Sequence, residues 1–277
     1  MKLSVVLISL NSEKTITKTL EAVKWADEIV LVDSGSTDKT LDIARQFKAK
    51  IVHRAFDGYG SQKNFATQQA THDWILSLDD DEVLTPQLQQ EIQSLDLQNT
   101  DYEGFKIPRS LIFLGKLLRF SGEYCRLTLR LFNRKHGNWN AEYVHESVEV
   151  EGKVGVLKHQ ILHDSYRDLT DYFNKFNKYT SLGAKTLAER NKTVSTFKII
   201  SRFPITFLKI YLLKGSILDG YAGFMWALFT AMTPVVKYAK LREMYHGNPN
   251  VARESLPVSV ARESLPVSVN KTRESFP

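Results

Sequence analysis

The first half of the chain alternates between short, wholly apolar runs and longer segments in which apolar residues recur at helical spacing. Wholly apolar runs are typical of strands covered on both faces, and the longer segments are typical of amphipathic helices. The alternation predicts a mostly parallel, doubly wound α/β sheet. The predicted strands are 3–9, 28–32, 51–52 and 74–78, and the predicted helices between them are about 12–24, 41–47 and 61–71.

The pattern changes between residues 104 and 163, where short strand-like runs follow one another without a long helix between them. Glycine-containing turns separate these runs, which favours an antiparallel extension of the same domain. A long helix from 168 to 190 is predicted next. The predicted strands of the extension are 104–108, 126–132, 145–150 and 156–162.

Residues 195–245 combine apolar and basic character. From Phe197 to Lys214, apolar and aromatic residues alternate with lysine and arginine, which predicts a basic amphipathic helix interrupted at Pro204. Residues 221–236 carry no charge, but a bilayer-spanning helix needs about 20 apolar residues. We expect a helix that lies in or dips into one membrane leaflet, with a buried helical hairpin as the alternative.

Charge is distributed unevenly along the chain. The 37 Lys and Arg residues against 31 Asp and Glu give a net charge of +6, and residues 191–249 hold the excess. A nucleic-acid-binding protein would more often carry a basic stripe over its folded head, so no nucleic acid is expected as a partner. The single cysteine, Cys125, excludes a disulfide scaffold. The nonapeptide VARESLPVS occurs twice in succession after residue 250, which predicts a disordered tail.

Three consecutive carboxylates, Asp79, Asp80 and Asp81, directly follow the predicted strand 74–78. Alternate residues of an extended segment point the same way, so Asp79 and Asp81 can face one cation. Carboxylate oxygens suit Mg²⁺ or Mn²⁺, especially where substrate phosphates complete the coordination shell. An acidic loop that caps the helix beginning near Pro86 is the alternative interpretation.

Other polar residues also follow predicted strands, and in open α/β sheets ligands bind at the carboxyl ends of the strands. Asn11 and Asp33 lie there, and a carboxylate such as Asp33 can accept hydrogen bonds from a nucleobase or a ribose. Lys63, near the start of a predicted helix, can pair with a diphosphate, although a solvated surface lysine is the alternative. The sequence contains neither GxxxxGK[ST] nor GxGxxG after the first strand, which disfavours a P-loop NTPase and a dinucleotide-binding site.

Two His-acid pairs lie in the predicted extension: His145-Glu146 and His163-Asp164. A glutamate can act as a general base where the fold directs it at an acceptor hydroxyl. His163 is a candidate ligand of a metal or a phosphate. A purely structural role is the alternative for each of these residues.

The order of these segments resembles the family 2 glycosyltransferases of GT-A fold over roughly residues 1–165. The segments that carry the resemblance are SVVLISLNSEKTI, EIVLVDSGSTDKTLDIA, GSQKNFA and WILSLDDDE. The downstream segments RLTLRLFNR, YVHESV and ILHDSY are similar to those of lipopolysaccharide-core β-1,4-glucosyltransferases of the WaaE/KdtX type.

The resemblance implies an α/β fold, namely a GT-A-type doubly wound mixed sheet with an antiparallel extension and C-terminal membrane-associating helices. It divides the chain into a nucleotide-sugar transferase domain over 1–165, a basic helical region over 166–248 that meets the membrane surface or the acceptor, and a repeat tail over 249–277. The implied location is peripheral, at the cytoplasmic face of the inner membrane.

The implied reaction is a metal-dependent, inverting transfer of a hexose, by the resemblance glucose, from a UDP-sugar to the inner-core heptose of lipopolysaccharide or lipooligosaccharide. The implied cofactor is Mg²⁺ or Mn²⁺, and the implied partners are the UDP-sugar donor, a lipid-anchored heptose acceptor and the membrane surface. A polyprenyl-phosphate acceptor and a catalytically silent nucleotide-sugar-binding module are the alternatives.

The resemblance also assigns roles to individual residues. Glu146 matches the catalytic base, and Glu142, four residues before it, is a rival. Asp80 stands where family members often have alanine, so which carboxylates of the triplet act is left open. The remaining assignments are Asn11, Asp33, Lys63 and Asp80 for nucleotide-sugar binding, and Asp79, Asp81 and His163 for the metal.

Overall fold

The computed structural model describes residues 2–140, 146–166 and 168–247. These residues pack as two units, which are described separately. The first unit comprises Met1–Asn174 and Ile205–Thr230, and the second comprises Lys175–Pro204 and Ala231–Pro277. The helical region predicted for 166–248 is thus divided between the units. The division by function stays a prediction, and the repeat tail lies outside the described residues.

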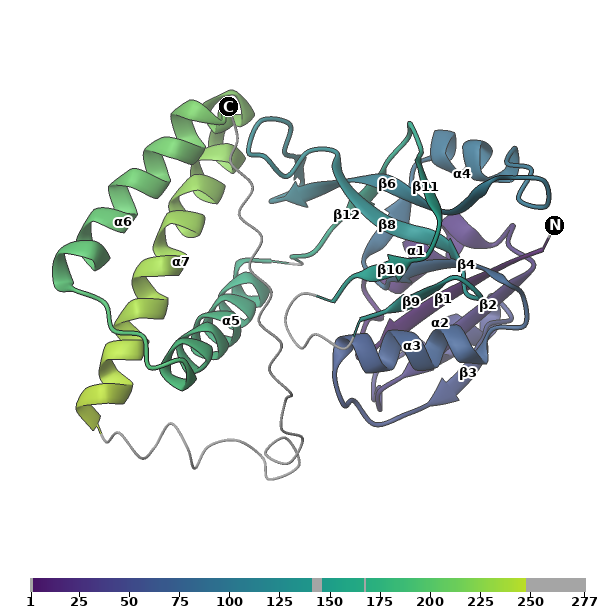
Figure 1. Ribbon diagram of the computed structural model, residues 1–277, viewed down its shortest axis with the longest axis horizontal. Helices are drawn as coiled ribbons and strands as arrows, with labels where there is room; N and C mark the ends of the chain where they lie inside the picture. Colours follow the sequence, from purple (N-terminus) through teal and green to yellow (C-terminus); the bar gives the residue numbers. More distant parts are fainter. Residues whose placement is uncertain (1, 141–145, 167, 248–277) are drawn as a thin grey trace. The chain divides into compact units, whose positions relative to one another are not determined.

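Four parallel strands form one half of the sheet of the first unit, in the order β3-β2-β1-β4 (Figure 1). The register pairs Ser9 with Asp33 and Ile8 with Asp79, so the carboxyl ends of β1, β2 and β4 lie at one edge. The strands are β1 (Leu3–Ser9), β2 (Glu28–Asp33), β3 (Lys50–His53) and β4 (Trp74–Asp79), and the helices that connect them are α1 (Ile16–Val23), α2 (Thr40–Gln46) and α3 (Tyr59–Gln69).

The other half of the sheet is mixed. β8 (Arg126–Asn133) runs antiparallel to both β4 and β6 (Tyr102–Phe113), as the predicted extension requires. β11 and β12, however, run parallel to β6, because a short strand has the same apolar pattern in either direction and its sequence does not fix its orientation. The remaining elements are β5 (Glu82–Leu84), α4 (Pro86–Gln93), β7 (Lys116–Leu117), β9 (Gly137–Trp139), β10 (Val148–Val150), β11 (Lys153–Val156) and β12 (Ile161–His163). The mixed, doubly wound α/β fold predicted from the sequence is confirmed.

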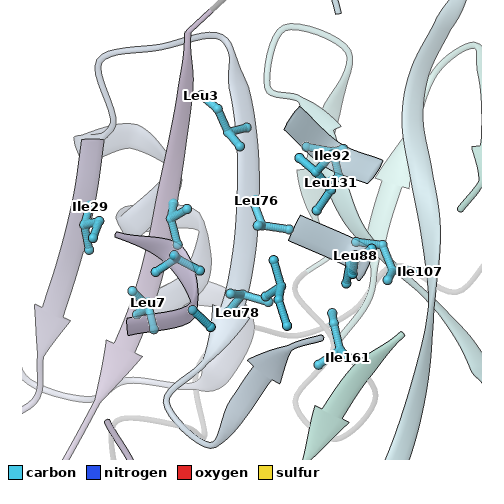
Figure 2. Packing of buried hydrophobic residues seen from close by; sticks show 14 of the residues in the cluster. Leu3, Leu7, Ile29, Leu76, Leu78, Leu88, Ile92, Ile107, Leu131 and Ile161 are labelled. Carbon is cyan, nitrogen blue, oxygen red and sulfur yellow. The ribbon is translucent and has the colours of Figure 1, made fainter. Parts of the chain in front are cut away.

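Alternate residues of the central strands enter two apolar layers, one on each face of the sheet, which explains why the strands are apolar throughout. One layer joins strand leucines to α4 and to the extension (Figure 2). Burial of each such leucine contributes roughly 1.5–3 kcal/mol, so the edge that carries the polar residues rests on a fixed base. The labelled residues of this layer are Leu3, Leu7, Ile29, Leu76, Leu78, Leu88, Ile92, Ile107, Leu131 and Ile161.

Helices dominate the described residues from 168 to 247. They are α5 (Leu169–Glu189), α6 (Thr196–Leu208), a π-helical turn η1 (Lys209–Leu213), a 3-10 turn η2 (Ser216–Asp219) and α7 (Gly220–Gly247). The interruption predicted at Pro204 is wrong, because α6 continues through it. A proline removes one backbone donor, and the turns on either side keep their own hydrogen bonds. None of the helices in the described part of the chain is both long and apolar enough to cross a membrane.

The second unit has a small core of its own, formed by Ala184, Ala188 and Leu241. Next to it, Lys240 Nζ donates hydrogen bonds to the Asn177 carbonyl oxygen at 2.9 Å and to the Thr180 hydroxyl at 2.9 Å. These bonds join α7 to α5 within this unit.

Candidate functional site

Asp33 ends β2 and is buried. Its carboxylate accepts hydrogen bonds from the backbone N–H groups of Gly35 at 2.9 Å and Ser36 at 3.0 Å. Gly35 has φ of 104°, a conformation that glycine adopts at little cost. His53 Nδ1 lies 3.3 Å from the carboxylate. The Asp-Ser-Gly-Ser sequence therefore builds a local turn that fixes Asp33 at the edge of the sheet.

Asn11 follows β1 and ties its loop to the loop after β2. Its N–H donates to Ser36 Oγ at 2.9 Å, and its side-chain oxygen accepts from the N–H of Thr37 at 2.9 Å. Asn11 adopts φ of 53°, a left-handed conformation that asparagine tolerates better than most residues. The structure thus gives Asn11 a loop-tying role, and its contact with a nucleotide stays a prediction.

Asp80 is turned toward the loop after β1. Its carboxylate accepts a hydrogen bond from the Ser12 hydroxyl, and its carbonyl oxygen accepts one from Thr19 Oγ1 at 3.1 Å. Burial, and then the negative charge of Asp81, raise the pKa of Asp80 to about 6. A carboxyl group in this setting is suited to share a proton or to gain a cationic neighbour.

Asp79, the last residue of β4, lies between two buried cations. Lys63 Nζ is 2.9 Å from its Oδ1, and Arg130 Nη2 is 2.7 Å from its Oδ2. Burial opposes ionisation of Asp79, but Arg130 and Lys63 outweigh it and hold the pKa of Asp79 well below its usual range. The negative charge of Asp79 is therefore stabilised, and each of its two oxygens lies beside a cation.

Glu82 and Arg130 form the base of this charge cluster, and the sequence analysis assigned a role to neither. Arg130 Nη2 is 2.6 Å from Glu82 Oε1, and Arg109 is 3.1 Å from the same oxygen. The other oxygen of Glu82 accepts the N–H of Asp79 at 3.1 Å. The available signal for Arg130 was its position as the one charged residue within the stretch 127–132, whose other residues are apolar except for Thr128.

Lys63 also reaches Glu146, whose Oε1 lies 3.4 Å from the ammonium group. The ammonium group stands 4.5 Å from the centre of the Trp139 ring, a favourable cation–π distance. Asn64 fixes Trp139 through two bonds, from its side-chain amide to the Trp139 carbonyl at 2.8 Å and from the Trp139 N–H to its side-chain oxygen at 2.9 Å. The rival residue Glu142 and the neighbour His145 lie outside the described residues.

Asp81 and His163 face each other at the end of the sheet. His163 Nε2 lies 3.2 Å from Asp81 Oδ1, yet no described donor meets this buried oxygen with hydrogen-bond geometry. Burial favours neutral His163, but Asp81 and then Glu82 outweigh it and raise the pKa of His163.

The donor atoms of Asp81 and His163 fit a divalent cation. The buried Asp81 Oδ1 meets no described donor with hydrogen-bond geometry, so it is available to a cation, and His163 would join it as a ligand in its neutral form. Among the described residues no group of three or more His, Cys, Asp or Glu side chains surrounds a common point, so substrate oxygens or water would complete the shell. Asp79 could become a further ligand of this cation only after one of its oxygens had lost its contact with Lys63 or Arg130.

The predicted site residues thus fall into linked groups at one sheet edge. Lys63, Asp79 and Glu146 are in mutual reach through the lysine, and Asp81 meets His163. Asp33 and Asn11 belong to the neighbouring turn. The loop after β1 links this turn to the acidic triplet, because the Asn11 N–H donates to Ser36 Oγ and the Ser12 hydroxyl donates to the carboxylate of Asp80.

Comparison with known proteins identifies the relatives of this chain. The Glycosyl transferase family 2 domain matches residues 4–139. The chain is 30% identical over 260 residues to the lipopolysaccharide core biosynthesis glycosyltransferase LpsC of Rhizobium meliloti, which covers 91% of this chain and 96% of that protein. It is 27% identical over 288 residues to an uncharacterized glycosyltransferase of Rickettsia typhi, with 100% and 99% covered.

Among solved structures, residues 1–349 of TarS from S. aureus align with a TM-score of 0.46 and 17% identity, over 90% of this chain and 92% of that one. The sequence relationship to LpsC extends over nearly the whole of both chains, and the family domain covers the strands that carry Asp33 and Asp79 and the helix that carries Lys63. The protein belongs to glycosyl transferase family 2.

Proposed function

We propose that the protein transfers a hexose, glucose in the first instance, from a UDP-sugar to the inner-core heptose of lipopolysaccharide or lipooligosaccharide, with inversion at the anomeric carbon. The observation that carries this proposal is the position of Lys63 between Asp79 and Glu146. It places a buried cation for a diphosphate beside a carboxylate that can accept a proton. The relationship to LpsC supports the choice of acceptor.

The donor lies along the sheet edge in this proposal. Asp33 and the loop of Asn11 hold the uridine, because a fixed carboxylate and backbone groups can pair with a base or a ribose. Lys63 faces the diphosphate and offsets the negative charge that grows on it as the sugar leaves. Arg130 keeps Asp79 in place while Lys63 turns toward the donor.

The residues that fit a divalent cation are Asp81 and His163, with Asp79 and the donor diphosphate as further ligands. When bound, Mg²⁺ or Mn²⁺ acts as a Lewis acid on the diphosphate. The carboxylate of Asp80 accepts a hydrogen bond from the Ser12 hydroxyl, which ties the acidic triplet to the loop after β1.

Glu146 accepts the proton of the acceptor hydroxyl. The hydroxyl oxygen forms a bond to the anomeric carbon while the bond from that carbon to the diphosphate oxygen breaks, and UDP leaves. A single displacement inverts the anomeric centre, so an α-linked donor gives a β-glycoside. The basic and apolar residues of α6 and the turns after it support a peripheral location, and we assign the reaction to the cytoplasmic face of the inner membrane, where it would meet a lipid-anchored heptose acceptor.

The direct test is turnover with a defined donor and acceptor. Purified protein is incubated with UDP-glucose, Mg²⁺ or Mn²⁺ and a heptose-bearing core lipid, and UDP release and product mass are measured. We expect the acceptor to gain one hexose and EDTA to abolish the gain. Release with another UDP-sugar alone would change the hexose, and release only with a polyprenyl phosphate would change the acceptor. Tight UDP binding without release for any pair would identify a silent binding module.

The variant Asp81→Asn tests the assigned cation ligand. We expect turnover to fall by roughly 10²–10³-fold, as it does when a group that stabilises transition-state charge is removed. The fold should persist, because Asp81 lies at the sheet edge; circular dichroism and thermal unfolding check this. Asp101→Asn, at a side chain that is 83% exposed, is the matched control. Full turnover of Asp81→Asn would remove Asp81 from the site.

A further inference from the structure

The segment that joins α6 to α7 in the first unit exposes an unusual amount of apolar surface. It contains the turns η1 and η2 and the start of α7, and we refer to residues 209–221 as the connecting segment. The exposed fractions of Leu213, Leu218 and Tyr221 are 83%, 66% and 70%. Large exposed apolar patches mark surfaces that bind a partner or a membrane.

The connecting segment is held firmly, so this exposure is part of the folded structure. Asp219 is buried, and its carboxylate accepts the N–H groups of Arg119 at 3.0 Å and Phe120 at 2.9 Å. Lys116 Nζ donates to the Asp219 carbonyl oxygen at 2.8 Å. These bonds fasten the connecting segment to the turn that follows β7.

A second constraint joins the connecting segment to the first turn of α7. Ser216 Oγ donates to the Gly223 carbonyl oxygen at 3.0 Å. A Cβ at Gly223 would lie 1.9 Å from the Ser216 carbonyl oxygen, so only glycine permits this approach of the two backbones. The chain thus uses a buried carboxylate and a glycine to present leucines and a tyrosine to the solvent.

The exposed charged residues of the connecting segment itself are both basic. Lys209 and Lys214 are exposed within it, and Lys116 on β7 and Arg119 on the turn that follows are also exposed. Asp219, the sole acidic residue of 205–224, is buried against backbone N–H groups. An apolar tip with a cationic border fits the interface of a bilayer that contains anionic lipids.

We propose that the connecting segment is the lipid-contacting element of this protein. Leu213, Leu218 and Tyr221 enter the interface of an anionic membrane, while Lys209 and Lys214 meet headgroup phosphates. This inference deepens the peripheral location in the proposed function and rests on it. A second copy of the chain fits the surface less well, because a symmetric contact would bring the same lysines together.

Vesicle co-sedimentation of the full chain tests this inference. The probes are vesicles of phosphatidylethanolamine with phosphatidylglycerol, and vesicles of phosphatidylcholine alone. We expect binding to the anionic vesicles, a loss of at least about tenfold in Leu213→Ser/Leu218→Ser, and a loss of about 30-fold in Lys209→Gln/Lys214→Gln. Val156→Ser, at a 56% exposed apolar residue on β11, is the matched control and should bind like the parent.

Three outcomes would overturn the inference: unchanged binding of both double variants, equal binding to the two kinds of vesicle, or a dimer that the Leu213→Ser/Leu218→Ser change abolishes in sedimentation velocity. The vesicle assay contains no sugar nucleotide, so it is independent of glycosyl transfer. A parent protein that binds anionic vesicles through the connecting segment but releases no UDP would refute the proposed transfer alone. UDP release with a deacylated, water-soluble acceptor should be equal in the parent and in both double variants.

Discussion

Asp33 and Asp79 end neighbouring parts of one parallel sheet, yet they are held in opposite ways. Asp33 is satisfied by the backbone N–H groups of Gly35 and Ser36, two and three residues further along the chain. Asp79 is satisfied by the side chains of Lys63 and Arg130, which come from α3 and β8. The first carboxylate depends on a local turn, and the second depends on the assembled fold.

The difference indicates how far the effect of a substitution at each carboxylate should extend through the fold. A turn that closes within four residues forms wherever its own sequence allows, so Asp33 can be disturbed without consequences far away. The charged groups around Asp79 are buried, so the removal of one of them leaves a buried charge of the opposite sign without its partner.

Arg130→Met should produce the largest effect on stability. The change leaves the buried Glu82 with one cationic partner and Asp79 with one, and breaking a buried ion pair costs about 3–5 kcal/mol in the free energy of unfolding. Urea unfolding followed by circular dichroism measures this loss.

Arg126→Met on the same strand is the control, because Arg126 is 57% exposed and pairs with Glu123 at the surface. We expect a change below about 1 kcal/mol there. If both variants lost the same free energy, the cluster around Asp79 would be no stronger than a surface pair, and the comparison would fail.

Asp33→Ala should cost less, about 1–3 kcal/mol, because it leaves the two N–H groups of the turn without their acceptor. Asp33→Asn keeps one side-chain oxygen and should lose a smaller amount. Thermal unfolding of the two variants beside the parent measures the difference. An equal loss in both would mean that the negative charge, rather than the acceptor, holds the turn.

Glu91→Gln tests a carboxylate on α4 that resembles both: its partners are backbone N–H groups, as at Asp33, but they are distant in the sequence, as at Asp79. Burial opposes ionisation of Glu91, but the N–H groups of Lys158 and His159, at 2.8 and 2.9 Å, outweigh it and lower its pKa below 4.5. Since the pKa is lower in the folded state, Glu91 stabilises the protein above pH 4.5, and this contribution disappears as the pH falls through the folded value.

We therefore expect Glu91→Gln to lose about 1 kcal/mol at pH 7 and to approach the parent in acid. Urea unfolding at a series of pH values measures both. Glu21→Gln, at an exposed residue of α1, should show little change at any pH. If the loss in the free energy of unfolding of Glu91→Gln stayed constant down to pH 3, the stabilisation would not depend on the ionised form of Glu91.

The contrast between Asp33 and Asp79 also explains what the sequence could predict. The apolar runs define β1, β2 and β4, and the residues at their carboxyl ends share an edge, so the position of Asn11, Asp33 and Asp79 at that edge could be predicted. The turn that holds Asp33 is formed by residues adjacent to it in the sequence. The partners of Asp79 are distant in the sequence: Arg130 is 51 positions away, and the pattern of a single strand does not specify which strand lies beside it.

The same reason accounts for the other differences between prediction and structure. The direction of β11 and β12 depends on the path of the chain through β9 and β10, which apolar periodicity does not encode. Helix α6 passes through Pro204 because the loss of one hydrogen bond is small beside those that the rest of the helix keeps. Glu82 stood next to the predicted triplet, but its burial follows only from the position of β5 against β12.

The composition of the second unit from two separated stretches of chain has a consequence for its synthesis. Lys240 meets Asn177 across 63 positions, and Ala184 and Leu241 share a core. As the chain leaves the ribosome, α5 emerges well before the part of α7 that covers it. During synthesis, α5 is therefore exposed before the residues of α7 that pack on it have been made. The second unit can complete its folding only after residue 241 has been translated.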